Sequence, residues 1–178
     1  MKLGIVGAGT VGTAATRIAV GMGARVTVLD VNIDALTSLH NIFPDKIETL
    51  YSNPLNIDEA VSGADLVIST VLIPGRRAPQ LVKVDTVKKM KEGSVVVDVA
   101  IDQGGSTDIT KDHATSHTHP VFKEYGVTFY AVGNIPGTAA TLDSWSFNSF
   151  GIPIIIFSPL IIKNLVLYLY LYLFLYLF

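Results

Sequence analysis

The chain has 178 residues, a formal net charge of −2 and no cysteine. This length allows one ordinary domain, or a domain with an appendage, and excludes two full catalytic domains. The small net charge argues against nucleic acid as a partner, and the lack of cysteine excludes disulfides, a thiolate nucleophile and a cysteine zinc site. Glycines interrupt the apolar stretch after Lys2, so we expect no secretory signal and a cytoplasmic protein.

Short β-branched runs alternate with segments of helical periodicity through residue 137. We expect strands at 2–6, 25–30, 46–51, 65–70, 94–100 and 126–132. We expect helices at 10–22, at 33–43 after a cap at Asn32, from a cap at Asn56 to Gly63, and at 84–93. Strands without polar alternation, separated by helices, indicate a parallel sheet covered on both faces. The predicted fold is a doubly wound α/β domain.

The composition changes near residue 138. From Ile152 onward Lys163 is the only charged residue, and the chain ends in a low-complexity repeat of Leu with Tyr or Phe. We therefore predict two parts, an α/β domain at 1–137 and an atypical hydrophobic tail at 138–178.

The segment "VGAGTVG" follows the first predicted strand and opens the first predicted helix. In this pattern Gly7 permits a tight turn, Gly9 lets a pyrophosphate approach the backbone, and Gly12 lets helix and strand pack closely. The N–H groups at the helix start, at Thr10 and Val11, would hold phosphate. The pattern predicts dinucleotide binding, with an ordinary glycine turn as the alternative.

Asp30 lies 18 residues beyond Gly12, at the end of the second predicted strand. An aspartate at this position can accept hydrogen bonds from the adenosine ribose hydroxyls, and its charge repels the extra phosphate of NADP. The predicted cofactor is therefore NAD. The alternative is that Asp30 only caps its strand.

Pro74, Gly75 and Pro79 predict an irregular loop after the fourth strand, beside the switch point of the sheet. Ligands of doubly wound folds bind outside the carboxyl ends of the strands, so this loop is a candidate wall of the nicotinamide site. The alternative is a proline-rich connection with solvated Arg76 and Arg77.

The segment "VVVDVAIDQGG" should carry Asp102 and a glycine pair to the carboxyl edge of the sheet. Catalytic carboxylates occupy such edges, and so do aspartates that only cap the next turn. The segment alone leaves both interpretations open.

His113, His117 and His119 lie in "KDHATSHTHP", a spacing that raises the question of zinc. The segment is polar, no cysteine assists, and a histidine pair four residues apart needs a helix to converge on a metal. We expect a solvated loop and no metal site.

Four segments together resemble the NAD-binding domain of bacterial-type alanine dehydrogenase over about residues 3–137. They are "GAGTVGTAATRIAVGMGARVTVLDVN", "LYSNPLNIDEAVSGADLVISTVLIPGRRAP", "GSVVVDVAIDQGG" and "GVTFYAVGNIPG". The resemblance implies an NAD-dependent oxidoreductase that deaminates L-alanine to pyruvate and ammonia, and a homo-oligomer that is hexameric in the family. It implies an acid/base role for Asp102 and ribose binding by Asp30. The cofactor-site positions that it adds are Leu72, Ile73, Ile101 and Asn134.

The resemblance also implies that the family's substrate-binding half is missing, since the sequence opens on the first strand of the cofactor domain. Without the groups that position a substrate, we expect the chain to bind NAD better than it turns over alanine. The rival interpretations are a non-catalytic, membrane-tethered NAD-binding module and the NAD-binding subunit of a transhydrogenase.

Three interpretations compete for the tail. A shifted reading frame or unspliced sequence would explain the sudden loss of resemblance. Residues 152–178 are long enough for a membrane anchor, although Pro153, Pro159 and Lys163 interrupt them. Alternation of Leu with Tyr also has the period of a strand, which could pack or self-associate.

Overall fold

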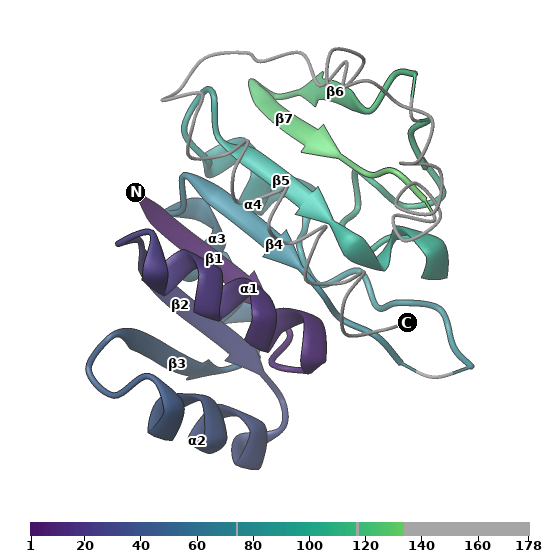
Figure 1. Cartoon of the computed structure of the whole chain (residues 1–178). Helices are drawn as coiled ribbons and strands as arrows, with labels where there is room; N and C mark the ends of the chain where they lie inside the picture. Colours follow the sequence, from purple (N-terminus) through teal and green to yellow (C-terminus); the bar gives the residue numbers. More distant parts are fainter. Residues whose placement is uncertain (74, 117, 134–178) are drawn as a thin grey trace, which may run out of the picture.

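The structure, a computed structural model, describes residues 1–73, 75–116 and 118–133. The strands are β1 (Lys2–Val6), β2 (Arg25–Asp30), β3 (Ile47–Tyr51), β4 (Leu66–Ser69), β5 (Val95–Asp98), β6 (Val121–Glu124) and β7 (Val127–Tyr130). They form one sheet in the order β3-β2-β1-β4-β5-β7-β6 (Figure 1). All pairings are parallel except that of β6 with β7. The predicted parallel α/β sheet is confirmed.

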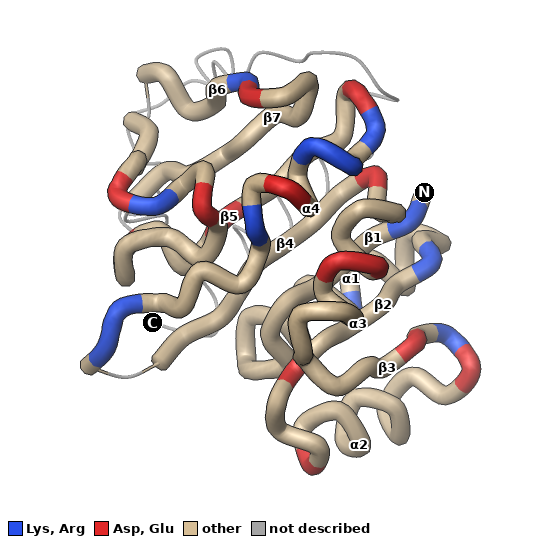
Figure 2. The backbone as a smooth tube through the Cα atoms, turned by 180° about the vertical axis from the view of Figure 1, so that it is seen from behind, with Lys and Arg blue, Asp and Glu red and all other residues tan. Residues whose placement is uncertain are grey.

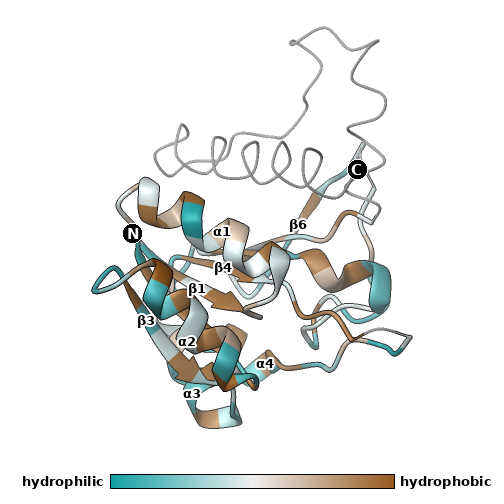
Figure 3. Cartoon of the chain, turned by 60° about the horizontal axis from the view of Figure 1, so that its bottom comes forward, coloured by the Kyte–Doolittle hydropathy of each residue, from teal (hydrophilic) through white to brown (hydrophobic). Residues whose placement is uncertain are grey.

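Helices cover both faces of this sheet. Helices α1 (Thr10–Gly21) and α2 (Ile33–Ile42) lie in front in Figure 1, and α3 (Pro54–Ser62) and α4 (Val84–Lys89) lie behind. Each pair of helices closes its own apolar layer against the strands. Figure 3 shows the apolar residues concentrated in the strands and on the helix sides that meet them. Burial on both faces explains why the strands lack polar alternation.

The fifth strand is shorter than predicted, and a different element follows it. β5 ends at Asp98, and the 3₁₀ helix η1 (Val99–Gln103) begins where the sequence predicts continued strand to residue 100. The physical reason is the Asp98 side chain, which accepts a hydrogen bond from the Ala100 N–H at 3.0 Å and so caps η1. Asp102 therefore sits on a helical turn.

Two helix boundaries also differ from prediction by more than one residue. The cap of α3 is Asn53, whose side-chain oxygen accepts the Asn56 N–H at 2.9 Å, with Pro54 in the first turn. The prediction of Asn56 as the cap is wrong because "NP" marks the helix start one turn earlier. α4 ends at Lys89 because the backbone at Met90 turns extended, with ψ 154°.

The edge strand β6 was not predicted. Its side chains are half-buried or exposed, so the apolar periodicity used to find strands is weak there. Its partner β7 lies within the predicted strand 126–132. Pairing with β7 supplies the hydrogen bonds that hold β6.

Acidic and basic residues are interspersed along the described chain (Figure 2). Within the described ranges no helix is long and apolar enough to cross a membrane. The tail at 138–178 and Asn134 lie outside the described residues, so the domain boundary at 137 and the interpretations of the tail stay predictions.

Candidate active site

The carboxyl ends of four neighbouring strands lie level with one another. In the strand register Val6 is aligned with Leu29 on β2 and with Ser69 on β4, and Ser69 is aligned with Asp98 on β5. The connections after these strands therefore meet at one edge of the sheet. They carry the three-glycine turn, Asp30, the loop at 70–82 and η1. This edge is where doubly wound folds bind ligands.

The glycine turn is built around two sites where a side chain would not fit. Gly7 has φ +111°, a conformation that L side chains rarely adopt. A Cβ atom on Gly12 would lie 1.9 Å from the Gly7 carbonyl oxygen. At Gly9, in contrast, an added Cβ would meet nothing within 4 Å. The turn therefore leaves open space above Gly9, where a ligand can approach the backbone.

Thr70 braces the glycine turn from the neighbouring strand, and sequence reasoning missed it. Its hydroxyl lies 3.2 Å from the Val6 carbonyl oxygen and 3.0 Å from the Gly7 carbonyl oxygen. A polar residue at the end of the apolar run "DLVIST" was the signal available in the sequence.

The first turn of α1 keeps its N–H groups available. Gly9 is the N-cap residue and supplies no side-chain acceptor, and the first turn contains no acidic residue. Thr10 is exposed and Val11 is half-buried. The helix start therefore presents a positive dipole end and unsatisfied donors, which suits a phosphate.

Asp30 joins the glycine turn to the start of α2. One carboxylate oxygen accepts the Ala8 N–H at 2.6 Å, and the other accepts the Asn32 N–H at 2.8 Å. Each oxygen of an ionised carboxylate can accept a second hydrogen bond. Asp30 is half-buried, so it can accept bonds from hydroxyls of a ligand while it holds the turn.

The loop at 70–82 presents apolar side chains to solvent at this edge. Leu72 is 67% exposed and Ile73 is 37% exposed. Large apolar side chains beside a polar turn are typical of a binding surface for a flat ring.

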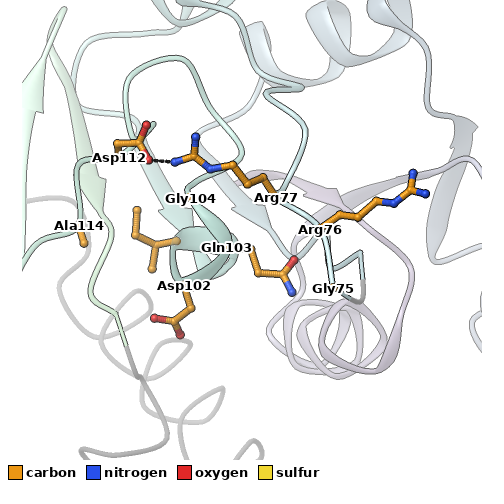
Figure 4. A pocket seen from close by; sticks show the side chains of 9 residues that line it. Gly75, Arg76, Arg77, Asp102, Gln103, Gly104, Asp112 and Ala114 are labelled. Atoms are coloured by element: carbon orange, nitrogen blue, oxygen red, sulfur yellow. Dashed lines mark hydrogen bonds and ion pairs between the residues drawn. The ribbon is translucent and has the colours of Figure 1, made fainter.

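Asp102 is exposed on η1 and lines an open pocket of about 690 Å³ (Figure 4). Its Oδ1 atom lies 3.0 Å from the position that a Cβ would take on Gly133, so glycine leaves room for the carboxylate there. The neighbouring Ile101 also lines the pocket but is only 5% exposed. The pocket brings Asp102 together with Gln103 and with Arg76 and Arg77 of the loop at 70–82.

Arg77 lies over the glycine pair that follows η1. Its guanidinium forms an ion pair with Asp112, and a Cβ on Gly104 would lie 3.1 Å from its Nε atom. Gly104 also has φ +93°. Arg77 therefore has a specific partner, although 68% of its side chain is exposed.

A buried carboxylate beneath η1 was also missed by sequence reasoning. Asp98 has no exposed surface. It accepts hydrogen bonds from Ala100 N–H at 3.0 Å, from Ser106 N–H at 2.8 Å and from the Ser106 hydroxyl at 2.8 Å, and also from the Thr110 hydroxyl. The Ser106 hydroxyl also lies 2.7 Å from the hydroxyl of Ser69 at the end of β4. This network fixes both ends of the turn that carries Asp102.

The described histidines do not gather around a metal site. His113 stacks on Phe122 with ring centroids 4.4 Å apart, in a segment without helix. Within the described ranges no group of His, Cys, Asp and Glu side chains could hold a metal ion. His117 lies outside the described residues.

Comparisons with known proteins agree with this geometry. The family profile described as "Alanine dehydrogenase/PNT, C-terminal domain" matches residues 1–156. The alanine dehydrogenase of Bacillus subtilis is 50% identical over 152 residues, which is 85% of this chain and 40% of that protein. The alanine dehydrogenase of Methanococcus maripaludis is 52% identical over 149 residues, 84% of this chain and 40% of that protein.

Solved structures give the same result. A structure titled L-alanine dehydrogenase superimposes with a TM-score of 0.72 and 49% identity, over 77% of this chain and 37% of that one. A transhydrogenase from Sinorhizobium meliloti gives 0.67 and 30% identity, over 98% of this chain and 45% of that one. The chain thus spans about 40% of the length of the curated relatives. This chain belongs to the alanine dehydrogenase/PNT family, and its α/β unit is that family's C-terminal, Rossmann-like NAD-binding domain.

Proposed function

We propose that this chain binds NAD(H) as the cofactor domain of an alanine dehydrogenase. The reaction would convert L-alanine, NAD and water to pyruvate, ammonia and NADH. The observation that carries the proposal is the meeting of four elements at one sheet edge. These are the three-glycine turn, Asp30, the exposed apolar pair Leu72 and Ile73, and the turn with Asp102.

Three of these four elements would hold the cofactor. The pyrophosphate would lie above Gly9 and accept hydrogen bonds from the N–H groups of Thr10 and Val11. Asp30 would accept bonds from the adenosine ribose hydroxyls and favour NAD over NADP by its charge. Leu72 and Ile73 would contact the nicotinamide ring, with Ile101 behind the pocket. Asn134, proposed as a further contact, lies outside the described residues.

Bound NAD would take up the hydride that leaves the α-carbon of alanine. Asp102 would then act on the substrate imine: its carboxylate takes a proton from the water whose oxygen bonds to the imine carbon. Asp102 would return this proton to the nitrogen of the carbinolamine, and as the carbon–nitrogen bond breaks and ammonia leaves, its carboxylate would take the hydroxyl proton so that the hydroxyl becomes the carbonyl of pyruvate. Its exposure in an open pocket gives water and substrate access to the carboxylate.

The named relatives extend the proposal beyond the cofactor. Their name, alanine dehydrogenase, supports L-alanine as the substrate. Pyruvate as the product and a cytoplasmic homo-oligomer, hexameric in the family, rest on the family resemblance alone. These parts of the proposal concern the whole protein, of which the chain spans about two fifths in its relatives.

Binding of NADH tests the proposal directly. Gly9→Trp places a large side chain in the open space at the carboxyl edge, and the backbone there needs no positive φ. Gly21→Trp is the matched control, because a Cβ on Gly21 also meets nothing within 4 Å but lies at the other end of α1. We expect the first change to abolish NADH fluorescence enhancement and the second to retain it. Equal NADH affinity in Gly9→Trp and the unchanged chain would refute the proposal.

Turnover is tested separately, by alanine-dependent formation of NADH. We expect Asp102→Asn to lose this activity and to keep NADH binding. A chain that binds NADH and forms none from alanine would function as a non-catalytic NAD-binding module.

A transhydrogenase function is the second candidate, favoured by the structural likeness to the Sinorhizobium meliloti protein, with a TM-score of 0.67. Sequence identity favours alanine dehydrogenase, since it is 49% for the solved alanine dehydrogenase and 30% for the transhydrogenase. Hydride transfer from NADH to an NADP analogue, without alanine, would support the second candidate.

A further inference from the structure

Gln103 is the neighbour of Asp102 on η1 and contacts a different connection of the sheet. Its side-chain oxygen Oε1 accepts the backbone N–H of Ile73 at 3.2 Å. Its own backbone carbonyl accepts the N–H of Ala78 at 2.9 Å. One residue therefore holds the loop at 70–82 at two points, and only one of them depends on the side chain.

The side-chain bond acts on the apolar part of the loop. Ile73 accepts the Arg76 N–H through its carbonyl at 3.1 Å, which closes a turn at the loop tip. Gln103 thus holds the residue where this turn begins, next to the exposed Leu72. Figure 4 shows the Gln103 side chain directed toward the part of the loop with Gly75 and Arg76, while Asp102 points elsewhere.

The other hydrogen bonds between these two connections lie nearer α4. The Arg77 guanidinium donates to the Asp112 carboxylate, and the Gln80 amide donates to the carbonyl of Gly105 at 3.2 Å. The N–H groups of Leu81 and Val82 donate to the carbonyl of Ser106 at 2.8 and 3.3 Å. Among the described residues, Gln103 Oε1 is the one acceptor of the Ile73 N–H. Loss of this bond would release the apolar end of the loop and leave its base attached.

We propose that Gln103 is a positioning residue whose side-chain carbonyl fixes Leu72 and Ile73 relative to the turn that carries Asp102. The nicotinamide wall and the proposed acid/base are thereby held as one unit, so that the ring and the carboxylate keep their separation. A loop that is already fixed in the free protein loses less conformational entropy when the ligand binds. The expected effect on cofactor binding rests on the proposed function. The expected effect on the loop rests only on the hydrogen bond between Ile73 and Gln103.

The structural part is tested on the protein without cofactor. Trypsin cleaves after Arg76 and Arg77, beside the turn that Gln103 holds, and its rate reports local opening of that segment. We expect Gln103→Ala to be cleaved there roughly threefold to tenfold faster than the unchanged chain, the range of one neutral hydrogen bond. Gln103→Glu keeps an acceptor at the same place and should restore the slow cleavage. Equal cleavage rates in the unchanged chain and Gln103→Ala overturn the inference.

The consequence for binding is tested with two ligands. NADH reaches the apolar wall, whereas ADP-ribose lacks the nicotinamide ring. We expect Gln103→Ala to weaken NADH roughly threefold to tenfold with ADP-ribose unchanged, and Gln103→Glu to restore NADH affinity. Gln80→Ala is the matched control, because it removes a side-chain amide that joins the base of the same loop to the carbonyl of Gly105. In this variant the ratio of the NADH affinity to the ADP-ribose affinity should not change.

The two proposals fail in different ways. If the unchanged chain binds neither NADH nor ADP-ribose, the proposed function fails, while the cleavage rates still decide the structural role of Gln103. If the unchanged chain binds both and Gln103→Ala loses both equally, or neither, the positioning role is overturned and the proposed function stands.

Discussion

The Asp98 carboxylate accepts two hydrogen bonds from Ser106, one from the backbone N–H and one from the hydroxyl, both at 2.8 Å. These bonds join the end of β5 to Ser106, so that η1 and the glycine pair lie in a loop closed at both ends. Asp98 and Ser106 are both fully buried, so these bonds form away from water, where an unpaired donor costs most.

Asp98→Asn should lower the free energy of unfolding by about 2 to 4 kcal/mol. Ala100 N–H faces Oδ1 and Ser106 N–H faces Oδ2, so whichever way the amide turns, one backbone N–H meets an NH₂ group. Urea denaturation measures the change. Asp34→Asn, which changes an exposed carboxylate in the first turn of α2, is the control, and it should stay within about 0.5 kcal/mol. An equal fall in the free energy of unfolding of the two variants would show that the buried hydrogen bonds of Asp98 do not stabilise the fold.

Gly12→Ala should destabilise the fold by about 3 kcal/mol or more, since its Cβ would lie 1.9 Å from the Gly7 carbonyl oxygen. Gly9→Ala should cost about 1 kcal/mol or less, because the added methyl meets nothing and only the cap preference changes. Thermal or urea unfolding of the two variants gives the comparison. The reverse order of stabilities would contradict the geometry of the turn.

Asp30→Asn should weaken NADH binding roughly tenfold, because the hydrogen bonds to the ribose lose their charge assistance. The affinity for NADPH should fall less than that for NADH, because the repulsion of its extra phosphate is removed, whereas the bond lost to the Ala8 or Asn32 N–H affects both cofactors. Fluorescence titration with both cofactors gives the ratio. Asp34→Asn, in the first turn of α2, is the control for a change of net charge alone, and it should leave the ratio unaltered. An unaltered ratio in Asp30→Asn would leave Asp30 with only its structural bonds.

Asp65 should make the stability depend on acid pH. The backbone N–H of Lys2 donates to its carboxylate at 2.7 Å, and this bond, together with Lys91 at 3.0 Å, lowers the pKa of Asp65 below its ordinary value of 3.8. A folded-state pKa below the unfolded one means that the ionised carboxylate stabilises the fold above pH 3.8. This contribution is lost as the pH falls through the lowered pKa.

The expected result is therefore a difference between the unchanged chain and Asp65→Asn that is present at neutral pH and shrinks below pH 3.8. Urea denaturation at a series of pH values measures it. If the unfolding free energies of the two proteins differ by the same amount at every pH, Asp65 has the same pKa in the folded and the unfolded chain.

The sheet could be predicted because its strands are short, apolar and bounded by glycine or polar residues. The predicted strands 2–6 and 25–30 coincide with β1 and β2, and Asn32 caps α2 through the Ala35 N–H as expected. Such signals are local, so the sequence contains them in full. β6 was missed because its stability comes from pairing with β7. The pattern of its own four residues contains no signal for that pairing.

The place of the candidate site in the fold was predictable from the sequence, and the contacts that support it were not. The glycine motif predicts the turn and Asp30, and the family resemblance adds Asp102. The structure brings the connections that carry these residues to one edge of the sheet. Asp98 and Thr70 act through bonds to residues that are distant in the chain, Ser106 and Gly7. The role of a carboxylate in an apolar run cannot be predicted until the fold shows which hydrogen-bond donors surround it.

The contact between Gly12 and Gly7 also has a genetic consequence. The atom that a side chain at position 12 would strike is a main-chain oxygen, which no amino-acid replacement removes. At Gly104 the nearest atoms belong to the Arg77 side chain, which a second mutation can shorten. Shortening Arg77 would remove this clash but leave the backbone strain of φ +93° at Gly104, so second-site changes at Arg77 should restore function only in part. Function lost by a change at Gly12 should return only by reversion of the same codon.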